Sequence, residues 1–266
     1  MPKINRWKRN KVSNVHFGDF SDKAFMWEES MKRILTGIFC AALSIFPASL
    51  FAGDAAVFSD IGFSQDGLTY VFGEYGKTDQ KYQAWAEIYT VDVEDNDYVS
   101  GGVFRTKPSN STANVSGKKA FEDLIKKSKW FWGKYNCVPS QPGNLLYVRE
   151  SEEKKPTEQI VFKDFESSTD EKSVYYYITL VPEYFGNGKN VESKFYISLE
   201  KKDAEGNLIE AKKIGTPDLK RKGVCGYRID RIFTDASGKS LIFIVEKTTI
   251  DDTGKSIRYM VEAARF

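Results

Sequence analysis

The stretch "FSQDGLTYVFGE", residues 63–74, follows a plan that the chain uses again. An aromatic residue comes first, then a turn with Ser or Thr and Asp, then Gly and an alternating strand. "FTDASGKSLIFIVE", residues 233–246, repeats this order, and "CVPSQPGNLLYVRE", residues 137–150, is a looser third copy. Because the turn residues fix the register of the strand that follows, the phrase predicts a β protein with a weakly repeated unit.

Most of the remaining sequence is also typical of strands, with aromatic and β-branched runs separated by Gly, Asp, Asn and Pro. Further strands are predicted over 85–93, 145–148, 159–162, 174–181, 194–200, 208–213, 227–233, 241–249 and 257–263. Residues 117–132 differ, since they carry apolar residues at helical spacing between a cap at Ser116 and a stop at Gly133. The predicted fold is mainly β, either propeller-like or a two-sheet antiparallel fold, with one α-helix covering a sheet.

Residues 31–52 follow the plan of a secretory signal peptide. Lys32 and Arg33 precede an apolar core that Pro47 breaks, and a cut after Ala52 leaves residues 53–266 as a single mainly-β domain. The apolar run is shorter than the ~20 residues of a spanning helix, so no transmembrane segment is expected in the mature chain. We interpret residues 1–30 as an extension upstream of the true start at Met31. The predicted location is therefore periplasmic or secreted.

The composition of the mature chain excludes several functions. Residues 1–52 hold eight of the 39 Lys and Arg and four of the 37 Asp and Glu, which leaves 31 basic and 33 acidic residues and a net charge near −2. That balance gives no electrostatic reason to expect a nucleic-acid partner. The single histidine, His16, lies in the removed part, which excludes catalytic triads with His and His-ligated zinc. We expect no cofactor.

Two cysteines remain in the mature chain, Cys137 and Cys225. In an oxidising compartment an isolated pair usually forms a disulfide, which is the prediction for these two residues. The alternative is two free buried thiols.

Two groups of acidic residues are candidates for chemistry. Glu74 and Glu87 lie on adjacent predicted strands beside aromatic residues, and a pair of carboxylates supports glycoside hydrolysis without histidine. The turn at residues 92–97 is rich in Asp but lacks the Gly and Glu of a calcium-binding EF-hand loop, so we interpret it as a solvated hairpin turn. No catalytic residue and no metal ligand is assigned.

The helix and the residues that end it are the candidates for binding. Trp130 and Trp132 form a predicted contact surface if they are exposed, and anchor the helix to the sheet if they are buried. The helix also carries lysines at positions 118, 119, 126 and 127. A basic amphipathic helix can lie on a membrane, and the alternative is a solvated helix that covers a sheet.

Residues 58–76 and 86–99, which include the first copy of the repeated phrase, resemble an uncharacterised family of predicted secreted bacterial proteins that is frequent in spirochaetes. The same residues are similar to blades of TolB-type periplasmic propellers. The resemblance carries over no catalytic residue. The leading hypothesis is an exported, non-enzymatic envelope or periplasmic binding or scaffold module whose partner is a protein or glycan of the envelope. The alternatives are a carboxylate-based hydrolase acting on glycan or peptidoglycan, and a membrane-surface adaptor.

Overall fold

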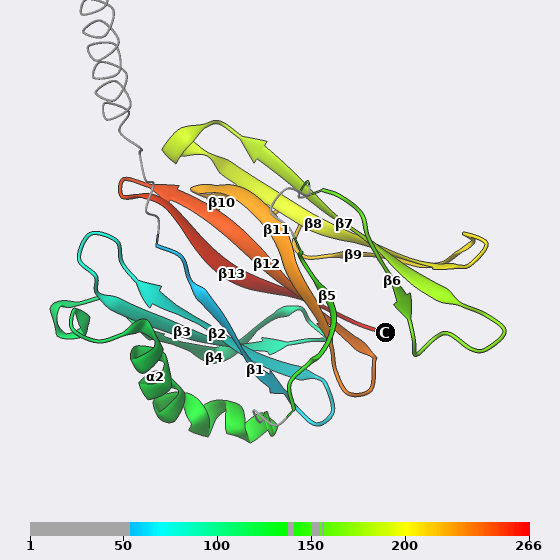
Figure 1. Ribbon diagram of the computed structural model, residues 1–266, viewed down its shortest axis with the longest axis horizontal. Helices are drawn as coiled ribbons and strands as arrows, with labels where there is room; N and C mark the ends of the chain where they lie inside the picture. The colour runs from blue at the N-terminus through cyan, green and yellow to red at the C-terminus, as the bar shows by residue number, and fades with distance from the viewer. Residues whose placement is uncertain (1–53, 138–140, 151–154, 156) are drawn as a thin grey trace, which may run out of the picture. The chain divides into compact units, whose positions relative to one another are not determined.

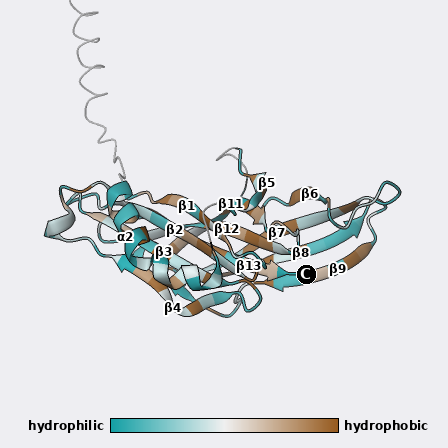
Figure 2. Ribbon diagram, turned by 90° about the horizontal axis from the view of Figure 1, so that it is seen from below, coloured by the Kyte–Doolittle hydropathy of each residue, from teal (hydrophilic) through white to brown (hydrophobic). Residues whose placement is uncertain are grey.

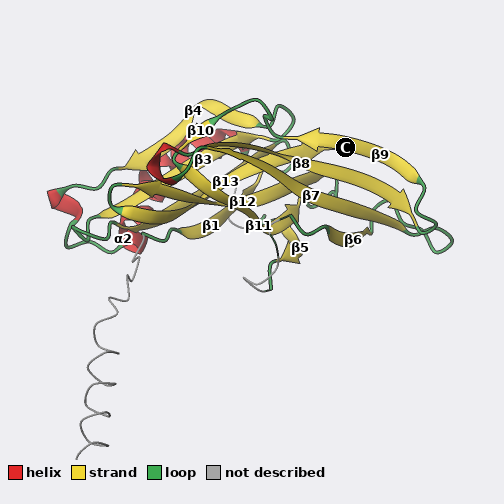
Figure 3. Cartoon of the chain, turned by 90° about the horizontal axis from the view of Figure 1, so that it is seen from above, coloured by secondary structure: helices red, strands yellow, loops and turns green. Residues whose placement is uncertain are grey.

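The strand-rich runs form three antiparallel sheets, which a computed structural model describes for residues 54–137, 141–150, 155 and 157–266. The predicted extension and signal peptide, residues 1–52, lie outside this part of the chain. Strands dominate the described residues (Figure 3). The mainly β prediction is therefore confirmed.

The first sheet, here called the helix-side sheet, is a simple meander. It contains β1 (Val57–Phe63), β2 (Thr69–Lys77), β3 (Ala84–Asp92) and β4 (Asp97–Thr106) in that order. After the short 3-10 turn η1 (Asn110–Thr112), the helix α2 (Gly117–Trp132) covers it, and a second 3-10 turn, η2 (Gly133–Tyr135), follows. The helix has the predicted bounds.

The other two sheets use the rest of the chain. The middle sheet has the order β13 (Gly254–Arg265), β12 (Ser240–Asp251), β11 (Val224–Thr234), β5 (Asn144–Val148). The outer sheet has the order β10 (Arg221–Lys222), β8 (Glu192–Asp203), β7 (Val174–Phe185), β6 (Ile160–Asp164), and β9 (Leu208–Ile214) also pairs with β8. The 3-10 turn η3 (Gly188–Asn190) connects β7 and β8.

Strand β12 shows why the sheets stack with the middle sheet between the other two. Leu241, Phe243 and Val245 belong to the hydrophobic cluster shared with the outer sheet. Ile242 and Ile244 belong to the cluster shared with the helix-side sheet. Both faces of the strand are therefore buried, which explains the unbroken apolar run of the second repeated phrase. Figure 2 shows brown, apolar segments along β11 and β12.

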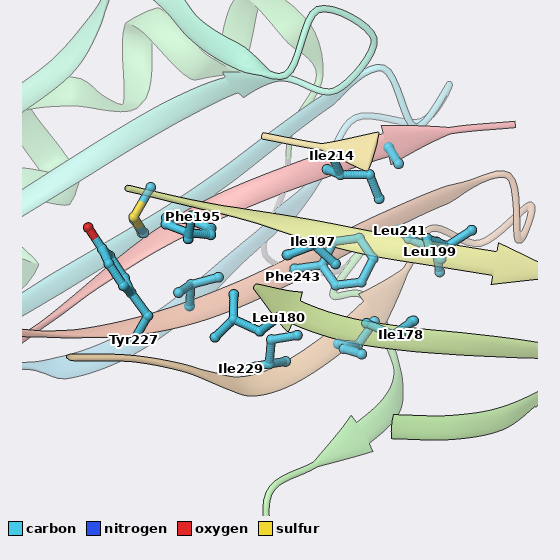
Figure 4. Close-up of a cluster of buried hydrophobic side chains, with 14 of the residues drawn as sticks. Ile178, Leu180, Phe195, Ile197, Leu199, Ile214, Tyr227, Ile229, Leu241 and Phe243 are labelled. Carbon is cyan, nitrogen blue, oxygen red and sulfur yellow. The ribbon is translucent and has the colours of Figure 1, made fainter. Parts of the chain in front are cut away.

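Three clusters of buried side chains, two of them met in β12, join the layers. Between the outer and middle sheets, Figure 4 shows Leu180 and Ile197 directed toward Ile229 and Phe243. On the other side of the helix-side sheet, a third cluster joins its strands to α2. The order of layers is outer sheet, middle sheet, helix-side sheet, helix. The predicted antiparallel alternative, in which packed sheets carry one covering helix, fits this stack of three antiparallel sheets, and the propeller-like alternative is not confirmed.

The three copies of the repeated phrase meet at one place. The Phe63 backbone N–H donates to the Gln141 carbonyl at 3.0 Å, and the Ser240 hydroxyl donates to the Gly67 carbonyl at 3.1 Å. A Cβ on Gly67 would lie 2.5 Å from an oxygen of Asp235, and the backbone there has a φ of +70°. Glycine is thus required both by conformation and by space. The phrases set turn geometry and also join the helix-side and middle sheets.

Candidate binding face on helix α2

Helix α2 begins and ends where its capping residues place it. The Ser116 hydroxyl accepts a hydrogen bond from the Lys119 backbone N–H at 3.1 Å. This bond satisfies one of the backbone N–H groups in the first turn that have no partner within the helix. The inward side consists of Ala120, Phe121, Leu124, Ser128 and Trp132, all buried. These positions recur at the spacing of three and four that defines one helix face.

Two glycines in β2 let the helix approach the sheet closely. A Cβ on Gly73 would lie 2.3 Å from Cε2 of Phe121, so only a glycine leaves room for that ring. Gly117, the first helix residue, lies against the backbone of Gly76, and a Cβ on it would be 2.8 Å from the Gly76 carbonyl oxygen. The position of α2 is therefore fixed by close packing along its length.

The outward side of α2 is basic toward its C-terminus. We call Lys126, Lys127, Lys129 and Lys134 the basic face; all four are exposed. No acidic residue occurs from 124 to 137. In the first half of the helix, by contrast, Lys119 pairs with Asp123 at 2.5 Å, and this hydrogen bond lowers the pKa of the Asp123 carboxyl.

An aromatic cluster, made of Phe104, Trp130, Phe131 and Tyr135, lies beside the basic face. The Trp130 ring meets Phe104 and Phe131 edge-on, with centroids 6.3 and 5.7 Å apart. The Lys134 ammonium lies 4.6 Å from the centroid of the Trp130 ring, within cation–π range. Trp130 is 61% exposed, so packing holds one side of the indole and leaves the other in water.

The two predicted contact residues have opposite environments. Trp132 is 1% exposed, packs between helix and sheet, and donates from its indole N–H to the Ser128 hydroxyl at 3.4 Å. It anchors the helix and cannot touch a partner. Trp130 alone is accessible, and its neighbours Phe104 and Lys134 were not singled out from the sequence.

The candidate carboxylates are brought together, but Glu74 is sealed from solvent and Glu87 is only half-buried. Glu74 and Glu87 are direct partners in the register of β2 and β3, so their Cβ atoms lie about 5 Å apart. Glu74 is 1% exposed, and one of its oxygens accepts the Tyr259 backbone N–H at 2.8 Å. Glu87 accepts from the Arg105 guanidinium at 3.0 Å and from the Tyr89 hydroxyl. Glu74 therefore lies between two sheets, whereas Glu87 is held by residues of its own sheet.

Burial controls the protonation of Glu74. Loss of water raises the pKa of this carboxyl to about 7, against the opposing effects of the Tyr259 N–H and of the charges on Lys247 and Arg258. A carboxyl with such a pKa suits a general acid, but a substrate needs access to it. A cavity of about 260 Å³ lies between β5, the residues before β6 and β11, and Glu74 and Glu87 are not among its lining residues.

Glu74 has a structural role at the edge of β13. Three outward N–H groups of this edge strand have partners from outside the middle sheet. Tyr259 donates to Glu74, Ala263 donates to the Asn96 side chain at 2.6 Å, and Ile257 donates to the Asp54 carbonyl at 2.9 Å. These contacts occupy donors that an unpaired strand edge would offer to another chain. The acidic hairpin turn thus contributes Asn96 to structure, and within the described residues no three His, Cys, Asp or Glu side chains form a metal-binding group.

The 260 Å³ cavity is basic at one end but its charge is compensated. Arg149 and Arg228 line it. Arg149 pairs with Glu246 at 2.8 Å and with Asp230 at 3.3 Å, and Arg228 lies 4.0 Å from Glu246. These ion pairs connect β5, β11 and β12, which indicates a structural network at this cavity.

The predicted disulfide is not present. Both described cysteines are free, and they belong to different layers. Cys137 is buried in the cluster between α2 and the helix-side sheet, where burial raises the pKa of its thiol to about 12. Cys225 is half-buried in β11 of the middle sheet. The alternative prediction was two free buried thiols. Both thiols are free, but only Cys137 is fully buried.

The described residues thus form a layered β protein with one covering helix and an exposed face of aromatic residues and lysines. A family model described as "Predicted secreted protein (DUF2259)" matches residues 71–265, and the chain belongs to this family. The match supports a secreted protein and the predicted resemblance to a secreted family. Comparisons with curated proteins and with solved structures give no match. Among the described helices, none is both long enough and apolar enough to cross a bilayer.

Proposed function

We propose that residues 53–266 act in the periplasm or at the cell envelope as a binding or scaffold module, through the basic face and the aromatic cluster. The observation that carries this proposal is the exposure of Trp130, 61%, on a helix that is otherwise well packed. An indole held on one side by Phe104 and Phe131 is a preorganised contact, because little side-chain entropy remains to be lost on binding.

The geometry favours binding over the hydrolase alternative. Hydrolysis of a glycan needs two carboxyls that reach the scissile bond from a cleft. Glu74 is covered by β13 and hydrogen-bonded to its backbone, so a polymer cannot reach it without separating two sheets. Glu74 instead connects the helix-side and middle sheets.

Site-specific photo-crosslinking tests the proposal. We expect a benzoylphenylalanine placed at position 130 of the exported chain to form adducts with envelope components in intact cells. The same residue at position 165 is the matched control, because Phe165 is a 72% exposed aromatic residue in the turn after β6, and the Lys163 ammonium lies 5.8 Å from the centroid of its ring. Adducts from neither position, or equally from both, would contradict a binding role for the α2 face.

A further inference from the structure

We propose that the basic face and the aromatic cluster dock the mature chain reversibly on an anionic phospholipid surface. This inference rests on the proposed function and names the partner of the same face. Three features of the face carry it: its local charge, the position of Trp130, and the fact that the apolar side of α2 is already occupied.

The charge of the face differs from that of the whole mature chain. Residues 53–266 have a net charge near −2, whereas residues 124–137 carry four lysines and no carboxylate. All four lysines are exposed, and Lys134 makes cation–π contacts with two rings of the aromatic cluster. An anionic surface attracts each nearby lysine by about 1 kcal/mol, within a distance set by the salt concentration. The attraction thus orients the molecule with this face toward the lipid.

Trp130 supplies an interfacial anchor beside these charges. Trp is favoured at the level of lipid headgroups, where an apolar ring and a polar N–H are both satisfied. One side of the Trp130 indole is exposed, and the Lys134 ammonium lies 4.6 Å from the centroid of the ring. An aromatic surface and an ammonium are therefore presented together. Lysine stems can lie along apolar surface while the ammonium reaches phosphate.

The packing of α2 sets the depth of binding. A free amphipathic helix inserts its apolar side into the bilayer, but here Phe121, Leu124 and Trp132 are buried against the helix-side sheet. Only the basic face and the exposed part of the aromatic cluster remain for lipid. Binding is therefore shallow, dependent on salt and reversible.

The same features argue against an acidic protein as the occupant. Interfaces between proteins are depleted in Lys and centre on aromatic residues that fill pockets of the partner. Here four flexible lysines surround one tryptophan on the convex side of a helix. Such a surface suits a fluid layer of phosphates better than a single complementary shape.

Co-sedimentation with vesicles tests the inference. The mature chain is expected to bind vesicles of phosphatidylglycerol and phosphatidylcholine at about 0.1 M salt, and to be released from them at about 1 M, where charges are screened within about 3 Å. It is expected not to bind pure phosphatidylcholine. Lys126→Gln with Lys127→Gln should weaken binding about 30-fold, since two lysine contacts are lost. Trp130→Ala should weaken it about tenfold, if half of the exposed ring surface leaves water on binding.

The control variant removes an aromatic residue and a lysine from a different surface of the protein. Phe165→Ala with Lys163→Gln removes an exposed aromatic residue and its neighbouring lysine from β6 and the turn after it, and should leave binding unchanged. Equal binding to both kinds of vesicle, or no loss on removal of Lys126 and Lys127, would overturn the inference. If vesicles do not bind but position 130 crosslinks to an envelope protein, the lipid inference fails while the proposed function stands; if both assays are negative, both fail.

Discussion

Replacement of Glu74 by Gln should remove a pH dependence of stability that the fold itself creates. The glutamine amide has nearly the same shape, and its carbonyl oxygen can still accept the Tyr259 backbone N–H that holds β13 against the helix-side sheet. The change therefore removes an ionisable group and keeps the hydrogen bond. Lys247, whose pKa is lowered by burial, stays in place as a half-buried neighbour.

The magnitude follows from the pKa of the buried carboxyl. Burial raises it from an ordinary 4.5 to about 7. A folded-state pKa above the unfolded one means that the proton stabilises the fold. This stabilisation is complete below about pH 4.5 and is lost as the pH rises through about 7. It amounts to about 3 kcal/mol in total, and to about 2–3 kcal/mol between about pH 5 and about pH 8.

Urea unfolding of both proteins across this range measures the effect. The unfolding free energy of Glu74→Gln minus that of the natural sequence should rise by about 2–3 kcal/mol from about pH 5 to about pH 8. Taking the difference cancels the titration of groups that do not interact with Glu74. Glu122→Gln, which alters an exposed carboxylate of α2, serves as the control. A difference that stays constant with pH would refute the argument that Glu74 is sealed between the sheets.

Three further predictions concern the layers around α2. Trp132→Ala should lower the free energy of unfolding by about 3–5 kcal/mol, because the ring is fully buried. Trp130→Ala should lower it by less than about 1 kcal/mol. In urea unfolding, the midpoint should therefore fall much further for Trp132→Ala, with unchanged slopes for both variants. Gly73→Ala should cost about 1–3 kcal/mol and shift α2, because its methyl group would overlap a phenylalanine ring of the helix; unaltered hydrogen exchange in α2 would contradict this packing. Native protein should take up one maleimide rapidly, at Cys225, and a second at Cys137 only after denaturation; no uptake before reduction would instead reveal a disulfide.

The sequence predicted the helix accurately because its signals are local. Ser116 and Gly133 mark its ends, and the apolar spacing of three and four marks its inward face. The same spacing also predicts which of the two tryptophans faces the sheet. Trp132 lies eight residues after Leu124 and so on the same side of the helix, whereas Trp130 is rotated away from it. Periodicity was therefore able to separate anchor from contact.

The number of sheets was harder to predict. Strand β4 was missed because the pair Gly101–Gly102 and several polar residues resemble a loop, although β3 holds them in a strand. The unbroken apolar run in β12 was treated as alternating, which concealed the burial of both its faces and hence the third layer. Pairing of Cys137 with Cys225 rested on cysteine count and compartment, neither of which reveals the layer that holds each thiol.

The Glu74 and Glu87 pair shows the same limit at the candidate site. Adjacent strands correctly predicted that the two carboxylates are neighbours. Whether solvent reaches this face of the sheet depends on β13. Its contact residue, Tyr259, is nearly 190 residues away from Glu74 in the sequence. The stacking of the middle sheet on this face turns Glu74 from a candidate catalytic residue into a buried structural contact.

Emission from Trp130 in the presence of brominated anionic phospholipid tests the central claim most directly. The mature chain has three tryptophans, and Trp85 and Trp132 are 5% and 1% exposed, so quenching by brominated lipid reports on Trp130. The account predicts quenching that saturates with lipid, is strongest for bromine near the headgroups, and disappears in Trp130→Ala. Undiminished emission from vesicle-bound protein would show that another surface meets the lipid, and would contradict docking through the α2 face.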